Sequence, residues 1–402
     1  MSDDVNTVLM LGRGQTGQSV CRYWERRGVH VDVSEPHTHH DWQDVWDSVS
    51  AHRYDLVMVS PGIKDNEILA KIKNLPGQRV MTDIDLFMSH APRNVIGLTG
   101  TNGKTTCVHW LADILSCHGH TLLLGNVGTP VLDAVENLAQ ADWVILELSS
   151  FQLAHSQAIA LKLACVLNIH DDHLDWHPSL KHYHESKWRI GEKAQIKLAH
   201  HDLNPDSAWY RFGGEEQSSP LPADLSYTQY QNALAVHRMC QLLDLPLGMD
   251  EVLAKAPKLR HRMEVIGTRN QWIWVNDSKA TNMHAAKTCL KSMRRQYPGT
   301  RIIWLAGGVL KERVPVDIHD WADDILGFGR DGHLICSHHF PTLQACLTYL
   351  HGESIRCGSE NTMVCLSPAG ASFDEFSNYQ HRGDMFCQWL KEVTGECTNT
   401  HD

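Results

Sequence analysis

Val95-Ile-Gly-Leu-Thr-Gly-Thr-Asn-Gly-Lys-Thr-Thr106 joins a short apolar run to a glycine-rich turn, and a helix-prone segment follows through Cys117. Glycines let backbone N–H groups point at phosphate oxygens, and a helix N-terminus adds positive potential. The pattern predicts that Lys104 bridges the β- and γ-phosphates of a nucleotide and that the Thr105 hydroxyl ligates Mg²⁺. The usual spacing needs glycine where this chain has Leu98, so the loop is a variant that starts at Gly100. The alternative is a glycine turn with a surface lysine.

Two further apolar runs follow, Trp143–Leu148 and Leu163–Ile169, and each ends in polar residues. Parallel strands bring their carboxyl ends to one edge of a sheet, where ligands bind. Glu147 lies at such an end, and phosphate-bound Mg²⁺ prefers carboxylate ligands. We therefore predict that Glu147 helps to hold Mg²⁺. A helix-capping or solvated carboxylate is the alternative.

The first third of the chain has its own glycine turn, Gly12-Arg-Gly14-Gln-Thr-Gly17, between an expected strand at Val5–Leu11 and an expected helix at Gln18–Arg27. A strand at Val29–Val33 follows and ends near Glu35. This order is typical of a Rossmann-like nucleotide site. A tight turn without a ligand remains the alternative.

The chain is predicted to be α/β with three domains, because strand, polar loop and helix alternate throughout. The expected domains are residues 1–92, 93–258 and 259–402, and a chain of 402 residues is long enough for two or three cores. Further strands are expected in the first and last domains, at Leu56–Ser60, Trp272–Val275, Arg301–Leu305 and Met363–Leu366.

Composition excludes several classes of protein. Lys and Arg total 36 against 47 Asp and Glu, a net charge of −11 without a basic block, so we expect no nucleic-acid binding. No apolar run reaches roughly 18 residues, so we expect no membrane insertion. The 12 cysteines form no C-x-x-C pair, and the first residues lack an export signal, so we predict a cytoplasmic protein.

Histidines are frequent, 27 in all, and the densest group is His170, His173 and His177 with His182 and His184 nearby. A zinc site is one interpretation of this group. Carboxylates are interspersed and cysteine is absent from the segment, which favours an interpretation without a dedicated zinc site.

Several segments together resemble the Mur ligase family: Gly100–Thr106, Glu147–Leu153, Leu167–Asp175 and Asn276–Asn282. The ending Leu366-Ser-Pro-Ala-x-Ala-Ser-Phe-Asp-x-Phe-x-Asn378, with Arg382-Gly383 and Phe386, resembles the branch that adds glutamate. The resemblance covers nearly the whole chain.

The resemblance implies a Rossmann-like N-terminal domain for a UDP-sugar, a central P-loop ATPase with a mostly parallel sheet, and a Rossmann-like C-terminal domain for glutamate. It implies an ATP-dependent acid–D-amino-acid ligase that adds D-glutamate to UDP-N-acetylmuramoyl-L-alanine through an acyl phosphate, in peptidoglycan precursor biosynthesis. ATP and Mg²⁺ are the implied cofactors, the implied partners are the small-molecule substrates, and we expect a monomer.

Carried over by position, the resemblance implies roles for individual residues. The catalytic positions are Lys104, His173 and Lys187. The ATP positions are Gly100, Thr101, Asn102, Gly103, Lys104, Thr105, Thr106, Asn232, Arg262 and Asp277. The UDP-sugar positions are Gln15, Thr16, Glu35 and Asn126. The glutamate positions are Thr281, Lys311, Ser372 and Tyr379. The metal positions are Thr105, Glu147, His173 and Lys187 as its carbamate.

The chain departs from the family pattern at Pro36-His37, in the short stretch between Lys197 and Asn232, and at Val309-Leu310 before Lys311. The phosphate and metal positions are intact, which favours an active ligase. The altered loop before Lys311 motivates a second hypothesis, a ligase for L-glutamate. The short stretch after Lys197 motivates a non-catalytic nucleotide-sugar-binding protein. The glycine turn of the first domain argues against a folate polyglutamylating ligase.

Overall fold

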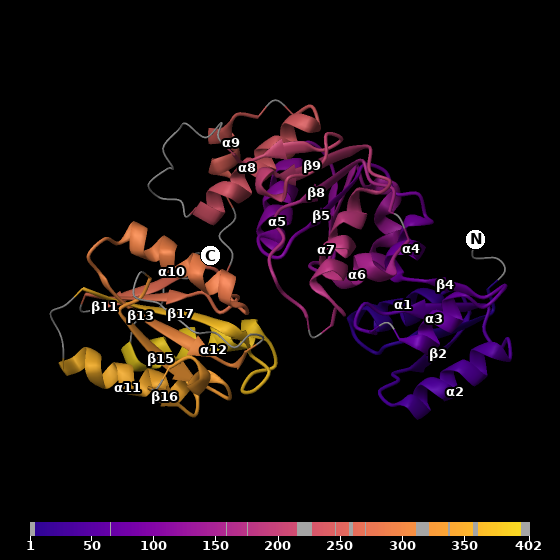
Figure 1. Cartoon of the computed structure of the whole chain (residues 1–402). Coiled ribbons are helices and arrows are strands. Elements are labelled where there is room, and N and C mark those ends of the chain that lie inside the picture. The colour runs from indigo at the N-terminus through magenta and orange to yellow at the C-terminus, as the bar shows by residue number, and fades with distance from the viewer. Residues whose placement is uncertain are drawn as a thin grey trace. The chain divides into compact units, whose positions relative to one another are not determined.

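The computed structural model describes most of the chain. The described residues are 5–64, 66–157, 159–174, 176–214, 227–245, 247–256, 260–269, 271–310, 321–336, 338–356 and 361–394. Within these ranges the strands form three main sheets, and helices pack against each of them (Figure 1). The described residues therefore have the α/β class that the sequence predicts.

The first sheet is parallel, in the order β2-β1-β3-β4. Its strands are β1 (Thr7–Leu11), β2 (His30–Ser34), β3 (Leu56–Val59) and β4 (Arg79–Met81). Its helices are α1 (Gln15–Glu25), α2 (His39–Ser50), α3 (Glu67–Lys73) and α4 (Asp83–Met88). The expected strands are confirmed to within two residues. The first helix begins at Gln15 rather than Gln18, because extended Gly14 is its N-cap.

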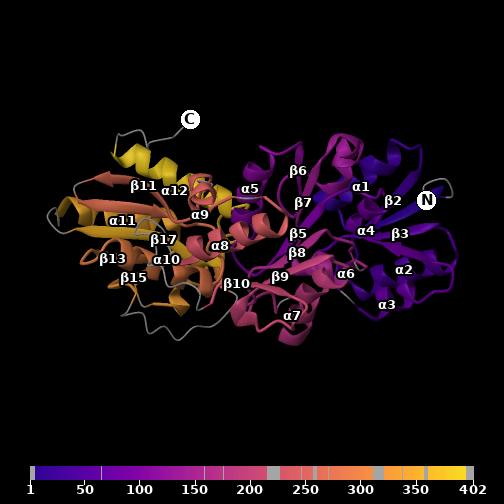
Figure 2. The same cartoon turned by 90° about the horizontal axis from the view of Figure 1, so that it is seen from above.

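The middle sheet is also parallel, in the order β10-β9-β8-β5-β7-β6 (Figure 2). Its strands are β5 (Val95–Thr99), β6 (Thr121–Gly125), β7 (Trp143–Glu147), β8 (Leu163–Val166), β9 (Ile196–His200) and β10 (Tyr210–Phe212). Its helices are α5 (Lys104–Leu115), η1 (Val131–Gln140), α6 (Ser150–His155), α7 (Leu180–Trp188), α8 (Tyr227–Leu242) and α9 (Met249–Ala254), where η1 is a 3₁₀ helix. β8 is shorter than expected because Asn168 bonds instead to Thr101 and Asn102 of the glycine turn Gly100–Gly103, called the phosphate loop below.

The third sheet has the order β11-β12-β17-β13-β15-β16 and is parallel except for β11. Its strands are β11 (Glu264–Arg269), β12 (Trp272–Asn276), β13 (Arg301–Gly307), β15 (Asp324–Phe328), β16 (His339–Phe340) and β17 (Thr362–Ala371). Its helices are α10 (Met283–Gln296), α11 (Leu343–Arg356) and α12 (Tyr379–Thr394). A short strand, β14 (Val309–Leu310), pairs antiparallel with the end of β17.

Apolar side chains pack on both faces of the middle sheet, because alternate residues of its strands belong to two different clusters. Val144 and Leu146 belong to one apolar cluster, and Ile145 between them belongs to another. Successive side chains of a strand point to opposite faces, so each cluster fills one side of the sheet. The first cluster also contains Val8 and Met10 of β1, so one core is continuous from the first sheet to the middle sheet.

The described residues group into two compact units. The first unit holds those up to 214 together with 231–256, and the second holds 227–230 and those from 260 onward. Each predicted domain range contains one main sheet, and the predicted boundaries themselves stay a prediction. None of the described helices is long and apolar enough to cross a membrane.

Candidate active site

The phosphate loop lies between the end of β5 and the start of α5. Gly103 has φ +83°, a conformation that side chains with a Cβ rarely adopt, and it is the N-cap of α5. Asn168, after β8, holds the loop from the next strand: its Oδ1 accepts from the Asn102 N–H at 2.9 Å and its Nδ2 donates to the Asn102 carbonyl at 3.0 Å. The first N–H groups of α5 therefore start from a fixed position, as phosphate binding requires.

Two lysines converge on this loop. Lys104 Nζ donates to the carbonyls of Gly100 at 2.6 Å and Thr101 at 3.0 Å. Lys187 Nζ donates to the same Gly100 carbonyl at 2.9 Å, although Lys187 belongs to α7 and is 2% exposed. Burial, and next the charge of Lys104, hold the pKa of Lys187 well below its usual value. The amine of Lys187 thus tends toward its neutral, nucleophilic form.

Glu147 ends β7 at the same edge of the sheet and is 1% exposed. Its Oε1 accepts from Asn126 Nδ2 at 2.9 Å, while its buried Oε2 has no hydrogen-bond partner among the described residues. A buried carboxylate oxygen without a partner is costly in a protein interior, and a cation would satisfy it. Glu147 and the Thr105 hydroxyl are hard oxygen donors, so these residues fit Mg²⁺ bound beside a phosphate.

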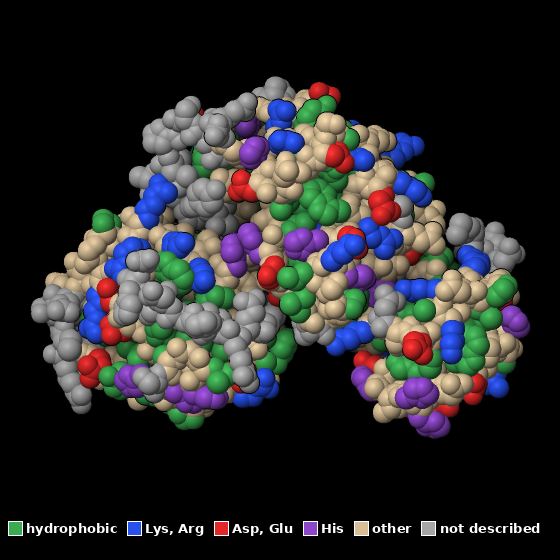
Figure 3. Space-filling view, in the orientation of Figure 1, with side chains coloured by type: hydrophobic (Ala, Val, Ile, Leu, Met, Phe, Trp, Pro, Cys, Tyr) green, Lys and Arg blue, Asp and Glu red, His purple; other side chains and the backbone are tan. Residues whose placement is uncertain are grey.

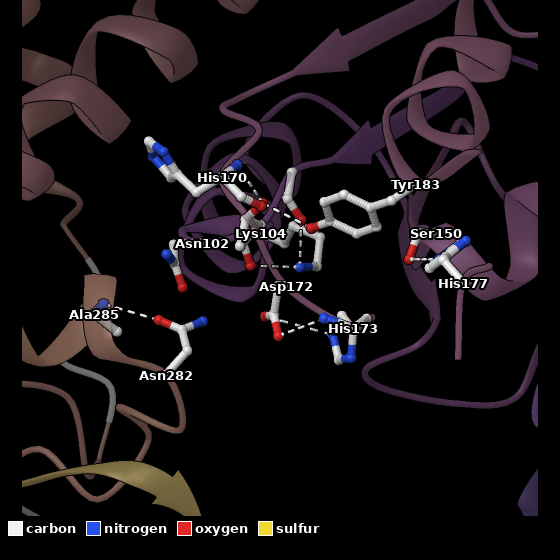
Figure 4. Close-up of polar contacts among 12 residues, drawn as sticks. Asn102, Lys104, Ser150, His170, Asp172, His173, His177, Tyr183, Asn282 and Ala285 are labelled. Atoms are coloured by element: carbon white, nitrogen blue, oxygen red, sulfur yellow. Dashed lines mark hydrogen bonds and ion pairs between the residues drawn. The ribbon is translucent and has the colours of Figure 1, made fainter. Parts of the chain in front are cut away.

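The segment after β8 supplies a third group of side chains at this edge. Asp172, 7% exposed, accepts from the His173 N–H at 2.8 Å, and its Oδ2 lies 3.6 Å from His173 Nε2. The Tyr183 hydroxyl lies 2.7 Å from Thr101 Oγ1. Figure 4 shows Lys104, Asp172 and Tyr183 around the loop and His173 beside Asp172. The predicted His173 thus contacts Asp172, which belongs to the same segment after β8.

No group of three or more His, Cys, Asp or Glu side chains is placed to hold a metal ion by itself within the part of the chain that the structure describes. His177 is instead bonded to its neighbours: its Nε2 lies 2.9 Å from Ser150 Oγ and its Nδ1 lies 2.9 Å from His182 Nδ1. A metal ion at this edge would therefore need phosphate or water oxygens in addition to the protein ligands.

Asn232, far along the chain on α8, also reaches the loop. A Cβ at Gly103 would lie 2.5 Å from Asn232 Oδ1, so the carboxamide packs directly on the glycine. Asn232 is 6% exposed. This predicted ATP position is thus next to the phosphate loop, and any larger residue at Gly103 would displace the Asn232 side chain.

Three of the four expected UDP-sugar residues follow strands of the first sheet. The Gly12 N–H donates to the Ser34 carbonyl at 2.8 Å, which brings the ends of β1 and β2 together. Gln15 and Glu35 follow these two ends and are exposed, and Thr16 is half-buried. Asn126, the fourth, directly follows β6 of the middle sheet and donates to Glu147.

In the second unit, Asp277 follows β12 and is 6% exposed. Its Oδ2 accepts from Ser367 Oγ at 2.7 Å and its Oδ1 accepts from the Met263 N–H at 3.2 Å. Burial raises the pKa of Asp277 to about 6, against the lowering effects of Ser367, Met263 and Arg262. The predicted pair Arg262 and Asp277 therefore interact electrostatically.

Among the expected glutamate residues, Thr281 lies between β12 and α10, Ser372 directly follows β17, and Tyr379 begins α12. Lys311 lies outside the described residues. Ser278 Oγ donates to the Tyr379 carbonyl at 2.8 Å, and Lys279 Nζ lies 4.0 Å from the centroid of the Tyr379 ring.

Four polar residues that contribute to these sites received no role from the sequence. Asn168 and Tyr183 hold the phosphate loop, Asp172 holds His173, and fully buried Arg382 donates to Ser278 and to the Gly370 carbonyl. The sequence could have indicated two of them: Asn168 lies two residues after the end of β8, and Arg382 belongs to the ending that resembles the family.

The middle sheet is parallel, and its carboxyl edge carries a glycine loop, a lysine that reaches into this loop and a carboxylate. These features define a phosphate-loop protein of the nucleotide-using α/β class. Residues 98–242 match the Mur ligase middle domain and residues 261–332 match the Mur ligase glutamate ligase domain. The chain belongs to the Mur ligase family.

Relatives and solved structures support this assignment. A UDP-N-acetylmuramoylalanine--D-glutamate ligase from Idiomarina loihiensis is 30% identical, with 94% of this chain and 95% of that protein covered. The fold is similar to that of UDP-N-acetylmuramate-alanine ligase from Thermotoga maritima, with a TM-score of 0.59, 14% identity and coverage of 96% and 99%. It is also similar to MurF ligase from Thermotoga maritima in complex with ADP, with a TM-score of 0.58, 15% identity and coverage of 87% and 92%.

Proposed function

We propose that this chain is an ATP-dependent ligase that joins D-glutamate to UDP-N-acetylmuramoyl-L-alanine in peptidoglycan precursor synthesis. The observation that carries the proposal is the convergence of Lys104, Lys187 and Glu147 on one sheet edge. The near full-length match to a protein named as a D-glutamate ligase supports the choice of substrates.

Amide formation from a free carboxylate needs activation, which ATP supplies. The alanyl carboxylate oxygen attacks the γ-phosphorus, ADP leaves, and an acyl phosphate forms. The glutamate amine then attacks the acyl carbon, and phosphate leaves from the tetrahedral intermediate. Lys104 would neutralise charge on the γ-phosphate, and the N–H groups at the start of α5 would bind the phosphate oxygens.

Thr105, Glu147, His173 and Lys187 as its carbamate are proposed to hold Mg²⁺, which would neutralise charge on the transferring phosphoryl group. The buried Oε2 of Glu147 supports this assignment. The lowered pKa of Lys187 supports carbamate formation, because the neutral amine is the form that attacks CO₂.

We further propose that the three main sheets correspond to three domains, 1–92, 93–258 and 259–402. The first is proposed to bind the UDP-sugar through Gln15, Thr16 and Glu35 with Asn126. The proposed ATP residues are Gly100–Thr106, Asn232, Arg262 and Asp277, and the proposed glutamate residues are Thr281, Lys311, Ser372 and Tyr379.

The protein is proposed to act as a cytoplasmic monomer on small molecules. Its net charge of −11 supports the absence of nucleic acid among its partners. On the face shown in Figure 3, cationic and anionic side chains of the described residues are interspersed.

A ligase for L-glutamate is the second candidate. Val309-Leu310, directly before Lys311, form β14 and pair with Gly370-Ala371, next to the predicted glutamate residue Ser372. Supplying D- and L-glutamate separately with ATP, Mg²⁺ and UDP-N-acetylmuramoyl-L-alanine, and measuring phosphate release, separates the two. We expect release with D-glutamate, whereas release with L-glutamate alone would reject the leading proposal.

A further inference from the structure

A four-residue loop, Ser60–Ile63, follows β3 and lies against the glycine turn of the first sheet. The Ser60 N–H donates to the Leu11 carbonyl at 2.9 Å, and the Ile63 N–H donates to the Ser60 carbonyl at 3.1 Å. A Cβ at Gly12 would lie 2.7 Å from the Ser60 Cβ and 3.7 Å from Ile63 Cγ1. The loop therefore forms one wall of the edge at which the UDP-sugar is proposed to bind.

Two side chains from segments that follow strands of the middle sheet contact this loop from its other side. His155 Nε2 lies 2.6 Å from the Ile63 carbonyl, and Trp176 Nε1 donates to the Gly62 carbonyl at 3.4 Å. His155 ends α6, the helix that follows Glu147, and Trp176 follows His173 by three residues. Both contacts thus come from the segments that carry the proposed metal ligands.

The tautomer of His155 is determined by its two neighbours. Lys73 Nζ lies 3.4 Å from His155 Nδ1, and an ammonium can only donate, so Nδ1 is the acceptor. The proton of the neutral ring is then on Nε2, which donates to the Ile63 carbonyl. Lys73 therefore keeps His155 in the form that bonds to the loop.

Aromatic packing keeps Trp176 in place. Its ring lies 4.6 Å from Phe151 and 5.3 Å from His155, measured between centroids, and Phe151 and His155 are one turn apart on α6. The neighbouring His177 packs on Trp176 at 4.6 Å and bonds to Ser150 at the start of α6 (Figure 4). Such packing reduces the rotamer freedom of the side chains that reach the loop.

We propose that His155 and Trp176 are positioning residues that hold the loop Ser60–Ile63 between the UDP-sugar edge and the edge carrying Glu147. This inference rests on the proposed function. A nucleotide-sugar bound at the first sheet must place its alanyl carboxylate near Lys104. A misplacement of the reacting atoms by about 1 Å lowers the rate roughly a hundredfold. The loop sets the distance between these two points. The proposed ATP site is the phosphate loop, which Asn168 holds by two hydrogen bonds to Asn102.

The test compares His155→Ala and Trp176→Phe with the wild type. We expect KM for UDP-N-acetylmuramoyl-L-alanine to rise about tenfold or more, because the loop loses a bond on one side. KM for ATP should change less than twofold, and amide hydrogen exchange at Gly62 and Ile63 should become faster. His155→Gln keeps an N–H donor, so its KM for the nucleotide-sugar should stay close to that of the wild type. His118→Ala, three residues after α5, and Trp143→Phe, at the start of β7, are the matched controls.

The two proposals fail in different ways. An inactive wild type that binds ADP rejects the proposed function, and hydrogen exchange of the variants still tests the loop contacts. An active wild type whose two variants keep both its KM for the nucleotide-sugar and its loop exchange overturns the positioning role. An equal rise in KM for both substrates also overturns it, since that result indicates general destabilisation. Retained ADP binding by the variants establishes that they are folded.

Discussion

Buried charged side chains lie at the strand ends of both the middle sheet and the third sheet. The two groups differ in their hydrogen-bond partners. At the middle sheet, Lys104 and Lys187 share one carbonyl, and Glu147 Oε2 lacks a partner among the described residues. At the third sheet, Asp277 accepts hydrogen bonds from Ser367 and Met263, and Arg382 donates to Ser278 and to the Gly370 carbonyl.

The difference indicates at which sheet edge a bound ligand would stabilise the fold. Like charges held together and an unpaired carboxylate oxygen destabilise the fold until an anion and a cation compensate them. At the third sheet, hydrogen bonds hold Asp277 and Arg382 in place, although burial still raises the pKa of Asp277 to about 6. A protein tolerates the first arrangement mainly at functional sites, where the ligand provides the compensation.

The strongest test of the middle site is Lys104→Met. We expect ATP-dependent phosphate release to fall roughly 10²- to 10³-fold, because the cation at the γ-phosphate is lost. Lys193→Met removes an exposed lysine of the same unit and is the matched control. Steady-state kinetics at saturating ATP measure the effect, and a Lys104→Met enzyme with wild-type turnover would contradict the assignment of the loop.

Lys187→Ala should lose most activity, on the order of 10²-fold, if the carbamate supports the metal. Added acetate should restore part of the activity, since it supplies a carboxylate in the space that the side chain leaves, and acetamide should not. Lys181→Ala, exposed on the same helix, is the control. Equal rescue by acetamide would show that volume rather than charge is restored.

Glu147→Gln should raise the Mg²⁺ concentration needed for half-maximal activity by roughly 10- to 100-fold. Glutamine can still accept from Asn126, so the change removes the charge and retains the hydrogen bond. Titration of activity with Mg²⁺ after chelation measures the shift, and Glu136→Gln on the exposed side of η1 is the control. An unchanged titration would place the metal elsewhere.

Asp277→Asn tests the third site through stability. The pKa of Asp277 is raised from 3.8 to about 6, so its favourable contribution is complete below pH 3.8 and is lost as the pH rises through 6. This shift corresponds to about 3 kcal/mol, and losing one hydrogen bond costs about 1 kcal/mol. The variant should therefore be more stable by about 2 kcal/mol at pH 7.5.

The gain of Asp277→Asn should disappear as the pH falls toward 4, where the wild-type carboxyl is already neutral. Hydrogen exchange in β12 and β17 measures the stability of this unit separately from the first unit. Asp324→Asn, on a partly exposed strand of the same sheet, is the control. A gain that is constant between pH 4 and pH 7.5 would contradict the role of burial.

Local patterns were sufficient for much of the fold. The apolar runs at β5, β7 and β12 and the glycine turn before Lys104 predicted strands, loop and helix, because backbone conformation there follows from neighbouring residues. The family, too, was recognisable from Gly100–Thr106 and the other quoted segments. The bounds of α1 and β8 were less accurate, since Gly14 and Asn168 act through contacts that periodicity does not contain.

The sequence by itself thus determined the α/β class, the family and the phosphate loop. The tertiary structure decided which distant groups meet that loop: Lys187 from α7, Asn232 from α8 and Asn168 from the end of β8. It also decided that Lys187 is buried, which holds its pKa well below the usual value. Burial and through-space charge depend on packing between segments remote in sequence, so no local pattern encodes them.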